Sequence, residues 1–196
     1  MGGAFHASEL FDHDPHATAA EIQSCGADAL AWAIELADEL NPPPIDVHLI
    51  RSFHRRWFAT TFPADCGRER LVIVANRKGT AVPPAAILPA VYNACDNWAY
   101  RFEEVVMAAS GEDQIELLVS EANALAVRVY DIHPFLDGNT RTTYLLRNYA
   151  LMLGGVGPVL NLHDDQAHID AWMAATPLEH RALDDIVLEA LFDQSI

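Results

Sequence analysis

The sequence predicts a mainly α-helical protein with one short β-hairpin. Apolar side chains recur at helical spacing through most of its 196 residues, and hydrophobic residues make up 51% of the chain. No internal repeat or low-complexity tract interrupts this pattern. Only residues 71–82 carry the β-branched run and central turn that are typical of a hairpin. A chain of this length is typical of one domain, so residues 1–196 are expected to form a single domain.

Residues that start or stop helices divide the rest of the chain. Three consecutive prolines, 42–44, cannot continue a helix and end the first one. Ser110 and Gly111 separate two long central helices, and Gly154 followed by Gly155 stops the next helix. The expected helices are Ala19–Leu40, Ile45–Phe58, Ala86–Ala109, Asp113–Asp131, Gly138–Leu153, Asp164–Ala174 and Leu178–Phe192.

The hairpin is expected in the segment LVIVANRKGTAV. Its first apolar run, residues 71–74, leads into a turn at Arg77, Lys78 and Gly79, and a shorter apolar run follows. Pro83 cannot donate a hydrogen bond to a neighbouring strand, so the hairpin is expected to end before it.

The charge balance excludes nucleic acid as a partner. Acidic residues outnumber basic ones by 28 to 12, and the formal net charge of -16 repels nucleic-acid phosphates over the whole surface. A phosphate-containing ligand therefore needs a local group of donors that outweighs this field.

The chain also lacks the sequence features of membrane insertion and of Sec-type export. No stretch approaches the roughly 18 uninterrupted apolar residues that span a bilayer, and the first residues have neither a basic start nor a long apolar run. Cys25, Cys66 and Cys95 form no C-x-x-C pair, which suits free thiols in a reducing compartment. We therefore expect a cytoplasmic protein with no membrane partner, or one delivered to a host cell by a non-classical secretion route.

Residues 132–141, IHPFLDGNTR, place several functional side chains in one connector between two helices. Pro134 keeps His133 out of helical geometry, so its imidazole is expected on a loop, where it can face a cleft. Histidine is largely neutral at physiological pH and can accept a proton from a hydroxyl nucleophile, which is what a general base does. Asp137 offers a hard oxygen ligand, and Mg²⁺ commonly takes only one or two protein carboxylates.

The start of the following helix predicts an anion site. Unpaired N–H groups and the positive end of the helix dipole favour a phosphate beside Gly138, Asn139 and Thr140. Glycine allows close backbone approach, the Asn139 amide can donate to a phosphoryl oxygen, and Arg141 adds a charged fork. Arg147 lies nearly two turns past Thr140 and is a candidate for a more distant phosphate contact.

A purely structural interpretation exists for each of these residues alone. Asp137 or Asn139 can cap the helix, and Phe135 can fill the core. Asp137 can also pair with Arg141 at i,i+4, which leaves His133 as an incidental polar residue. The joint occurrence of a base, a metal ligand, an anion-binding turn and an arginine favours a functional site.

The segment HPFLDGNTR resembles the signature of the Fic family, H-P-F-x-[D/E]-G-N-G-R-x-x-R, with Leu136 at the free position. The chain also resembles the family upstream, in the order of a His-bearing helix, an aromatic-Pro-Ala-Gly-x-x-Arg segment and a flap hairpin. These parts correspond to Phe53–Phe58, to Phe62, Pro63, Ala64, Gly67 and Arg70, and to residues 71–82.

This resemblance covers residues 45–155. It implies a Fic-type helical bundle with a short β-hairpin flap as the core of the domain. An N-terminal helical region, residues 1–44, precedes that core, and C-terminal helices, residues 156–196, follow it.

The resemblance implies a transferase that uses Mg²⁺ and moves AMP from ATP to a Ser, Thr or Tyr hydroxyl, most simply of a protein. His133 resembles the catalytic base, Asp137 the Mg²⁺ ligand and Asn139 the contact to the α-phosphate. Arg141 resembles the first phosphate-binding arginine, and Phe135 the core anchor of the loop. The catalytic set is therefore His133, Asn139 and Arg141, and the nucleotide-binding set is Gly138, Asn139, Thr140, Arg141, Tyr144 and Arg147.

Two positions depart from the family signature. Thr140 replaces a glycine that lines the anion hole, and Tyr144 replaces the second arginine, which holds the γ-phosphate in the family. Arg147, Arg77 or Lys78 can compensate, although a solvated surface charge is the simpler interpretation, above all for Lys78.

These departures leave the donor and the acceptor open. A phosphotransferase or an enzyme that modifies a small molecule keeps the fold, and a non-catalytic module that binds a nucleotide or a partner keeps it without turnover. The chain contains no [S/T]-x-x-x-E-[G/N] helix of the kind that inhibits many Fic proteins. An antitoxin or a second copy of the chain stays open as a partner.

Overall fold

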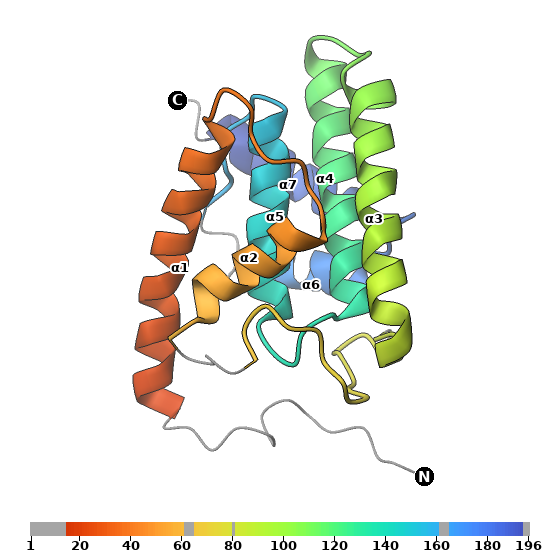
Figure 1. Ribbon diagram of the computed structural model, residues 1–196. Helices are drawn as coiled ribbons and strands as arrows, with labels where there is room; N and C mark the ends of the chain where they lie inside the picture. Colours follow the sequence, from red (N-terminus) through yellow and green to blue (C-terminus); the bar gives the residue numbers. More distant parts are fainter. Residues whose placement is uncertain (1–14, 61–64, 80, 161–164, 194–196) are drawn as a thin grey trace.

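The computed structural model describes residues 15–60, 65–79, 81–160 and 165–193 of the chain, with side chains from residue 23 onward. Regular structure in these residues is almost all helical, which confirms the predicted mainly α class (Figure 1). The elements are α1 (Pro15–Ala37), α2 (Val47–Phe58), η2 (Pro84–Ala86), α3 (Ile87–Arg101), η3 (Phe102–Val106), α4 (Glu112–Ile132), α5 (Asn139–Leu153), α6 (Gln166–Ala174) and α7 (Arg181–Asp193).

Helices α4 and α5 form the centre of a bundle (Figure 1). Helices α1 and α2 pack against α5, whereas α3 packs against α4, so α5 is buried along most of its length. Buried residues of α4, such as Leu118, Leu125 and Val129, recur at helical spacing and supply part of the core. After α5, Gly154 allows a close approach to α4, because a Cβ atom there would lie 2.3 Å from the side chain of Leu118.

Most helix boundaries agree with the sequence prediction to within a few residues. The side chains of Asp46 and Asp165 each accept a 2.7 Å hydrogen bond from a backbone N–H three residues later and so cap α2 and α6. The largest difference concerns Ala86–Ala109, where one helix is expected but the α-helix ends at Arg101 and a π-helical turn, η3, follows. Hydrophobic periodicity does not reveal such a wide turn, because the apolar pattern continues through it.

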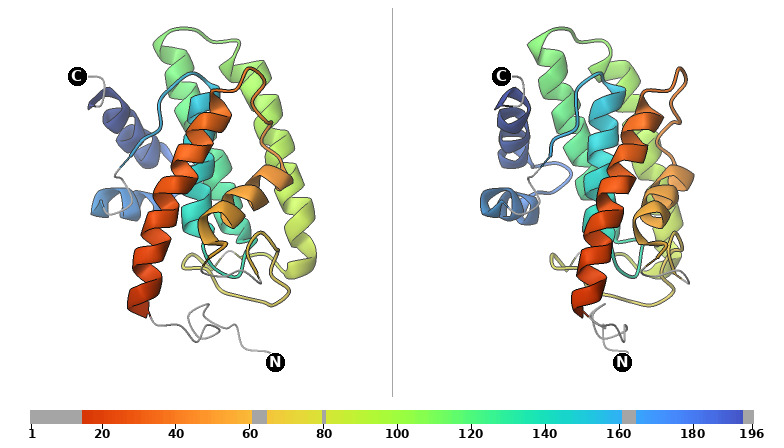
Figure 2. Two further views of the ribbon diagram at one scale, coloured as in Figure 1. Left: turned by 60° about the vertical axis from the view of Figure 1, so that its left-hand side comes forward. Right: turned by 90° about the vertical axis from the view of Figure 1, so that its left-hand side faces the viewer.

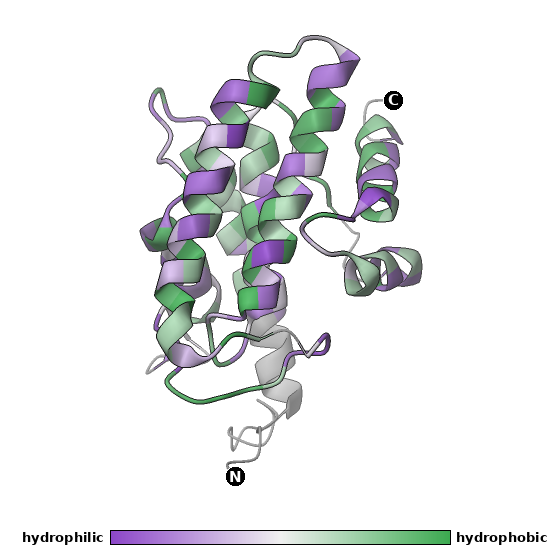
Figure 3. Ribbon diagram, turned by 90° about the vertical axis from the view of Figure 1, so that its right-hand side faces the viewer, coloured by the Kyte–Doolittle hydropathy of each residue, from purple (hydrophilic) through white to green (hydrophobic). Residues whose placement is uncertain are grey.

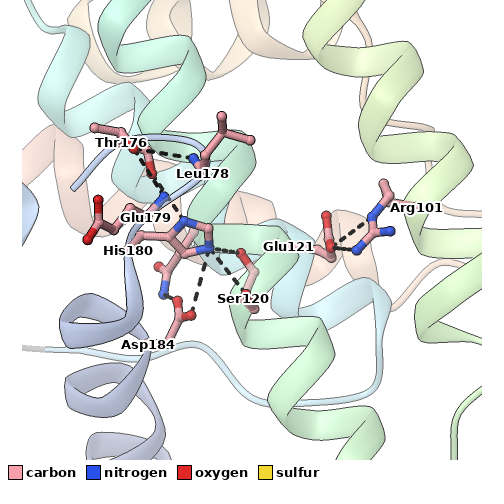
Figure 4. A network of polar contacts seen from close by, with 9 residues as sticks. Arg101, Ser120, Glu121, Thr176, Leu178, Glu179, His180 and Asp184 are labelled. Atoms are coloured by element: carbon pink, nitrogen blue, oxygen red, sulfur yellow. Dashed lines mark hydrogen bonds and ion pairs between the residues drawn. The ribbon is translucent and has the colours of Figure 1, made fainter.

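The C-terminal helices α6 and α7 lie together beside the bundle (Figure 2), and a polar network joins α7 to α4 (Figure 4). His180 precedes α7, with its Nδ1 3.1 Å from the carbonyl oxygen of Thr176 and its Nε2 3.0 Å from that of Ser120. Asp184 accepts a 2.8 Å hydrogen bond from Asn123, and burial raises the pKa of its carboxyl. These contacts fix the start of α7 against α4.

The β-hairpin predicted over residues 71–82 does not form in the described part of that segment. Leu71 is 90% exposed and Ile73 61% exposed, so most of the surface of these apolar side chains faces solvent. The carbonyl oxygens of Val72 and Val82 accept hydrogen bonds from the side chain of Arg70. The predicted flap hairpin is therefore not seen: in the described part of this segment only Val74 takes part in a β-bridge, and a turn follows at Asn76–Gly79.

The outer surface on the α3 side mixes hydrophilic and hydrophobic residues along each helix, as Figure 3 shows. This pattern is typical of helices that bury one face against a core. Within the described ranges, no helix combines the length and the apolar character needed to cross a bilayer.

Candidate active site

The loop that carries the predicted functional residues, residues 133–138, connects α4 to α5 at one end of the bundle (Figure 1). Helix α4 ends at His133, whose backbone is left-handed, with φ 54° and ψ 62°. Among the described residues it is the only one other than glycine with a positive φ. This conformation costs a residue with a Cβ atom about 1–2 kcal/mol, and Pro134 restricts the same backbone further. Neighbouring groups must therefore hold His133 in place.

The imidazole of His133 is half-buried and uncharged at neutral pH. Its Nδ1 is enclosed and makes no hydrogen bond in the described structure, and the Tyr130 ring lies edge-on with its centroid 5.9 Å away. Burial lowers the pKa of His133 to about 4, and the nearby positive charge of Arg70 acts in the same direction. The neutral ring can accept a proton, as a general base must.

Asp137 lies half-exposed on the same loop. One of its carboxylate oxygens accepts a 2.6 Å hydrogen bond from the N–H of Gly138. The carboxylate makes no ion pair with Arg141 or with any other described residue, so the i,i+4 pair of the structural interpretation is absent there. No cluster of three or more His, Cys, Asp or Glu residues that could hold a metal occurs in the described part of the chain. Asp137 thus fits a hard cation that takes its other ligands from water and phosphate oxygens.

Helix α5 presents its N-terminus next to Asp137. It begins after Gly138, which is left-handed at φ 75°, and no side chain caps it. Thr140 and Arg141 in its first turn are exposed, and Arg141 makes no hydrogen bond or ion pair with the described residues. An uncapped helix start beside an unpaired guanidinium is an arrangement that can bind a phosphate.

Asn139 faces inward instead of toward this exposed turn. Its Oδ1 accepts a 2.9 Å hydrogen bond from the Phe135 N–H, and its Nδ2 donates a 2.8 Å hydrogen bond to the Phe135 carbonyl. Phe135 is itself fully buried, in agreement with its predicted anchoring role. The side chain of Asn139 therefore closes the loop, and a phosphate contact from its amide requires this ring of hydrogen bonds to open.

Tyr144 and Arg147 also lie away from the loop. The Tyr144 hydroxyl donates a 2.7 Å hydrogen bond to the Val159 carbonyl. Arg147 is 0% exposed, stacks on the Tyr144 ring with its guanidinium carbon 4.7 Å from the centroid, and donates a 3.0 Å hydrogen bond to Nε2 of His168. Burial lowers the pKa of Arg147 to about 10. In this conformation Arg147 does not reach a ligand at the surface, so it does not replace the missing second arginine.

The two basic residues of the predicted turn behave differently from each other. Arg77 is exposed. Lys78 is not the solvated surface charge suggested by its position in the sequence, because its Nζ donates a 2.7 Å hydrogen bond to the Ala175 carbonyl and lies 3.5 Å from Asp131. Burial lowers the pKa of this amine. Lys78 therefore ties the segment after Arg70 to the residues before α7.

His54 links the segment around Gly67 to the loop at Asp137, two parts of the chain that are far apart in the sequence. Its Nδ1 accepts a 2.9 Å hydrogen bond from the Gly67 N–H, so the proton is on Nε2, which donates a 2.9 Å hydrogen bond to the Asp137 carbonyl. The ring packs between those of Phe58 and Phe135, tilted by 38° and 31°, at centroid distances of 4.9 and 4.0 Å. Burial lowers its pKa to about 4. A buried histidine flanked by aromatic residues was the available signal, but such a residue is more often part of the core than of a site.

Gly138 offers a direct test of how tightly the loop is packed. We expect Gly138→Ala to reduce the free energy of unfolding by about 1–3 kcal/mol more than Gly79→Ala does. A Cβ atom at Gly138 would lie 2.4 Å from the Phe58 ring, whereas at Gly79, with a similar φ of 70°, the described structure places nothing within 4 Å. Both variants carry the same left-handed strain, so their difference isolates the steric clash. Urea unfolding followed by circular dichroism measures both, and equal losses would show that the Phe58 ring moves aside freely.

The model of the Fic/DOC family matches residues 44–151 of this chain. The protein is also similar in sequence to curated relatives called protein adenylyltransferase. Fic-1 of Caenorhabditis briggsae is 33% identical over 116 residues, which are 59% of this chain and 21% of that protein. Fic of Nematostella vectensis is 32% identical over 125 residues, which are 62% of this chain and 26% of that protein. The chain thus spans only about a quarter of the length of these relatives or less.

Solved structures share the fold. A Fic domain containing signaling protein from Bacteroides thetaiotaomicron superposes with a TM-score of 0.68 at 17% identity, over 88% of this chain and 69% of that one. A segment of Fic-1 from Caenorhabditis elegans superposes with a TM-score of 0.66 at 22% identity, over 86% of this chain and 48% of that one. The helical architecture implied by the resemblance is therefore confirmed, while the flap hairpin is not seen.

Proposed function

Because the chain belongs to the Fic/DOC family, we propose that it transfers AMP from ATP to a hydroxyl group of a target protein. The observation that carries this proposal is a single connector that joins a neutral histidine, a half-exposed carboxylate and the uncapped start of a helix. The adenylyltransferase relatives support the choice of AMP as the transferred group.

In the proposed reaction, His133 removes the proton from the acceptor hydroxyl. The resulting oxygen nucleophile attacks the α-phosphorus of ATP, so that a new O–P bond forms while the bond to the bridging oxygen breaks and pyrophosphate leaves. We assign the stabilisation of negative charge on the phosphate oxygens to the first N–H groups of α5 and to Arg141. Asn139 acts indirectly, because its side chain keeps the loop closed on Phe135.

Asp137 is the residue that would hold Mg²⁺, which neutralises phosphate charge when bound. One carboxylate oxygen is oriented by the Gly138 N–H, which leaves the other for the cation. The Asp137 carbonyl is fixed by His54, so the main chain of this residue is held in place whether or not a cation is present.

A phosphotransferase, or a transferase acting on a small molecule, is the second candidate. The observation that favours it is Tyr144, which stands at the γ-phosphate arginine position and whose hydroxyl is engaged by Val159. A module that binds a nucleotide or a partner without turnover is a third candidate. The neutral His133 argues against that one, since binding alone needs no base.

Transfer from labelled ATP separates these candidates. Purified protein is incubated with a cell lysate and with ATP labelled at either the α- or the γ-phosphate. Label from the α position on protein supports AMP transfer, and label from the γ position supports phosphoryl transfer. If label appears only in small molecules, the acceptor is a small molecule and not a protein. No transfer from any labelled nucleotide would contradict both enzymatic proposals.

We expect the reaction to require a divalent cation through Asp137. EDTA should stop transfer and Mg²⁺ or Mn²⁺ should restore it, whereas Asp137→Ala should prevent rescue at ordinary metal concentrations. Asp96→Ala, which removes an exposed carboxylate on α3, is the matched control and should respond to metal like the unmodified protein. Full activity in chelator, or normal rescue of Asp137→Ala, would contradict the role of Asp137.

A further inference from the structure

We propose that Arg70 is a positioning residue for the base His133, an inference that rests on the proposed function of the loop. Arg70 binds three consecutive carbonyl groups of the loop, those of residues 132, 133 and 134, and so holds the backbone of His133 in its left-handed conformation. In the described structure it forms no hydrogen bond with the imidazole, so its contacts act on the base through the placement of His133, while its charge also lowers the pKa of the ring.

The contacts of Arg70 with the base loop come from both its main chain and its side chain. Its backbone N–H donates a 2.9 Å hydrogen bond to the Pro134 carbonyl. Its Nε donates a 2.7 Å hydrogen bond to the His133 carbonyl, and its Nη2 lies 3.4 Å from the Ile132 carbonyl. The residue is 4% exposed, so these bonds are shielded from water.

The same guanidinium also holds the segment that follows Arg70. Its Nη1 donates a 2.8 Å hydrogen bond to the Val72 carbonyl, and its Nη2 donates to the Val82 carbonyl. The Val82 N–H in turn lies 3.4 Å from the Ile132 carbonyl. Residues 72 and 82 and the base loop are thus held by one side chain, and a shift of that segment is expected to move His133.

A guanidinium suits this position better than any other side chain. It offers five N–H donors in a planar fork, and Arg70 directs them at four different carbonyl groups. Arg70 forms no ion pair in the described part of the chain. The carboxylate next to it in the sequence, that of Glu69, pairs with Arg51 at 2.6 Å instead. Burial of an unpaired charge is unfavourable, and it lowers the pKa of Arg70. An apolar residue could fill this space but could not donate hydrogen bonds. We therefore infer that arginine is needed here because several carbonyl groups require donors at one place.

His133 needs such support for two independent reasons. Its positive φ is unfavourable for a residue with a Cβ atom, and a following proline disfavours helical backbone geometry at the same position. The loop gives it little other help, because the His133 N–H is already used as the last amide of α4, bonded to the Val129 carbonyl at 3.1 Å. Without Arg70, the carbonyl of His133 has no donor, and the peptide is expected to rotate.

The test compares Arg70→Gln and Arg70→Lys with Arg68→Gln, which removes an exposed arginine two residues away. For each variant, kcat and the KM of the acceptor are measured by label transfer, the Kd of Mg-ATP by calorimetry and the Tm by circular dichroism. We expect Arg70→Gln to lower kcat by about 10²-fold, the effect of a displacement of roughly 1 Å at a reacting group. The Kd of ATP should stay within about twofold, because α5 and Arg141 are unchanged. The kcat of Arg70→Lys, whose ammonium cannot reach all four carbonyl groups, should lie between those of Arg70→Gln and the unmodified protein. Arg68→Gln should have the kcat of the unmodified protein.

An unchanged kcat in folded Arg70→Gln would overturn the proposal. So would a loss of kcat that is matched by an equal loss of ATP affinity, since that pattern indicates general damage to the fold. If Arg70→Gln does not fold, the same comparison is made with Arg70→Lys. A lower kcat with an unchanged Kd of ATP then supports the proposal, and an unchanged kcat or an equal loss of both overturns it.

Amide hydrogen exchange tests the role of Arg70 without any measurement of transfer, so its outcome does not depend on the proposed function. If the unmodified protein transfers no label, the proposed function fails, and exchange alone then decides the role of Arg70. The Phe135 and Val82 amides, which are bonded to the loop, should exchange at least about tenfold faster in Arg70→Lys than in Arg68→Gln, while the middle of α5 stays protected. Equal exchange in the two variants would show that Arg70 does not hold the loop.

Discussion

Replacing His133 with alanine is expected to lower the rate of transfer by at least about 10²-fold while the protein stays folded and still binds ATP. The loss arises because no other neutral, proton-accepting side chain of the loop can take the acceptor proton. His48→Ala is the matched control, since His48 is an exposed histidine on α2. Single-turnover transfer from α-labelled ATP measures the rate, and an unchanged rate in His133→Ala would contradict its role as the base.

The pH dependence of the same reaction provides a second measure of His133. A base must be deprotonated, and burial places the pKa of His133 at about 4. The value of kcat should therefore stay level from about pH 8 down to pH 5 and fall only as the pH approaches 4. A fall centred near 6.5, the ordinary pKa of histidine, would show that the imidazole is solvated in the working enzyme.

Acid is expected to destabilise the fold strongly through His54. Its pKa is about 4 in the folded protein, where burial is the main cause, against about 6.5 in the unfolded chain. Between these values the unfolded chain binds more protons, so the free energy of unfolding falls as the pH is lowered from 6.5 toward 4. The loss through His54 is on the order of 3 kcal/mol, and His133 adds to it in the same direction.

His54→Gln isolates this contribution. The variant cannot titrate, so its free energy of unfolding should depend less on pH between 7 and 4 than that of the unmodified protein, although it is less stable at pH 7 because glutamine does not fill the space between Phe58 and Phe135. His48→Gln, at an exposed site, should keep the full dependence. Chemical unfolding at several pH values measures all three proteins. The same pH dependence in His54→Gln and in the unmodified protein would mean that the pKa of His54 is the same in the folded and the unfolded protein.

The helices could be predicted from the sequence because helix formation depends on residues within a few turns. The apolar periodicity, the prolines at 42–44 and the Gly154–Gly155 stop are all local signals, and the structure agrees with them. The hairpin depended on pairing between two runs, and Arg70, which belongs to neither run, donates a hydrogen bond to a carbonyl of each of them. No pattern within residues 71–82 contains this information.

The position of the candidate site in the loop could be predicted from the sequence, but the direction in which each side chain points could not. The motif places His133, Asp137 and Gly138 at one turn, and the structure keeps them there. Helix α5, however, is buried on nearly all sides, so spacing along it could not indicate that Asn139 and Arg147 face inward. His54 and Arg70 donate hydrogen bonds to backbone carbonyl groups that are distant in the sequence. Every residue has such a carbonyl group, so a sequence motif cannot indicate these contacts.

The left-handed backbone of His133 also bears on how this sequence can evolve. Glycine adopts that conformation without strain, so a lineage selected for stability alone would gain about 1 kcal/mol by placing glycine at this position. Such a change would remove the imidazole. Under the proposed role of His133 as the base, its chemistry is retained at a cost in stability. A relative with glycine at this position and with Arg70 is then expected to keep the fold and to lack transferase activity.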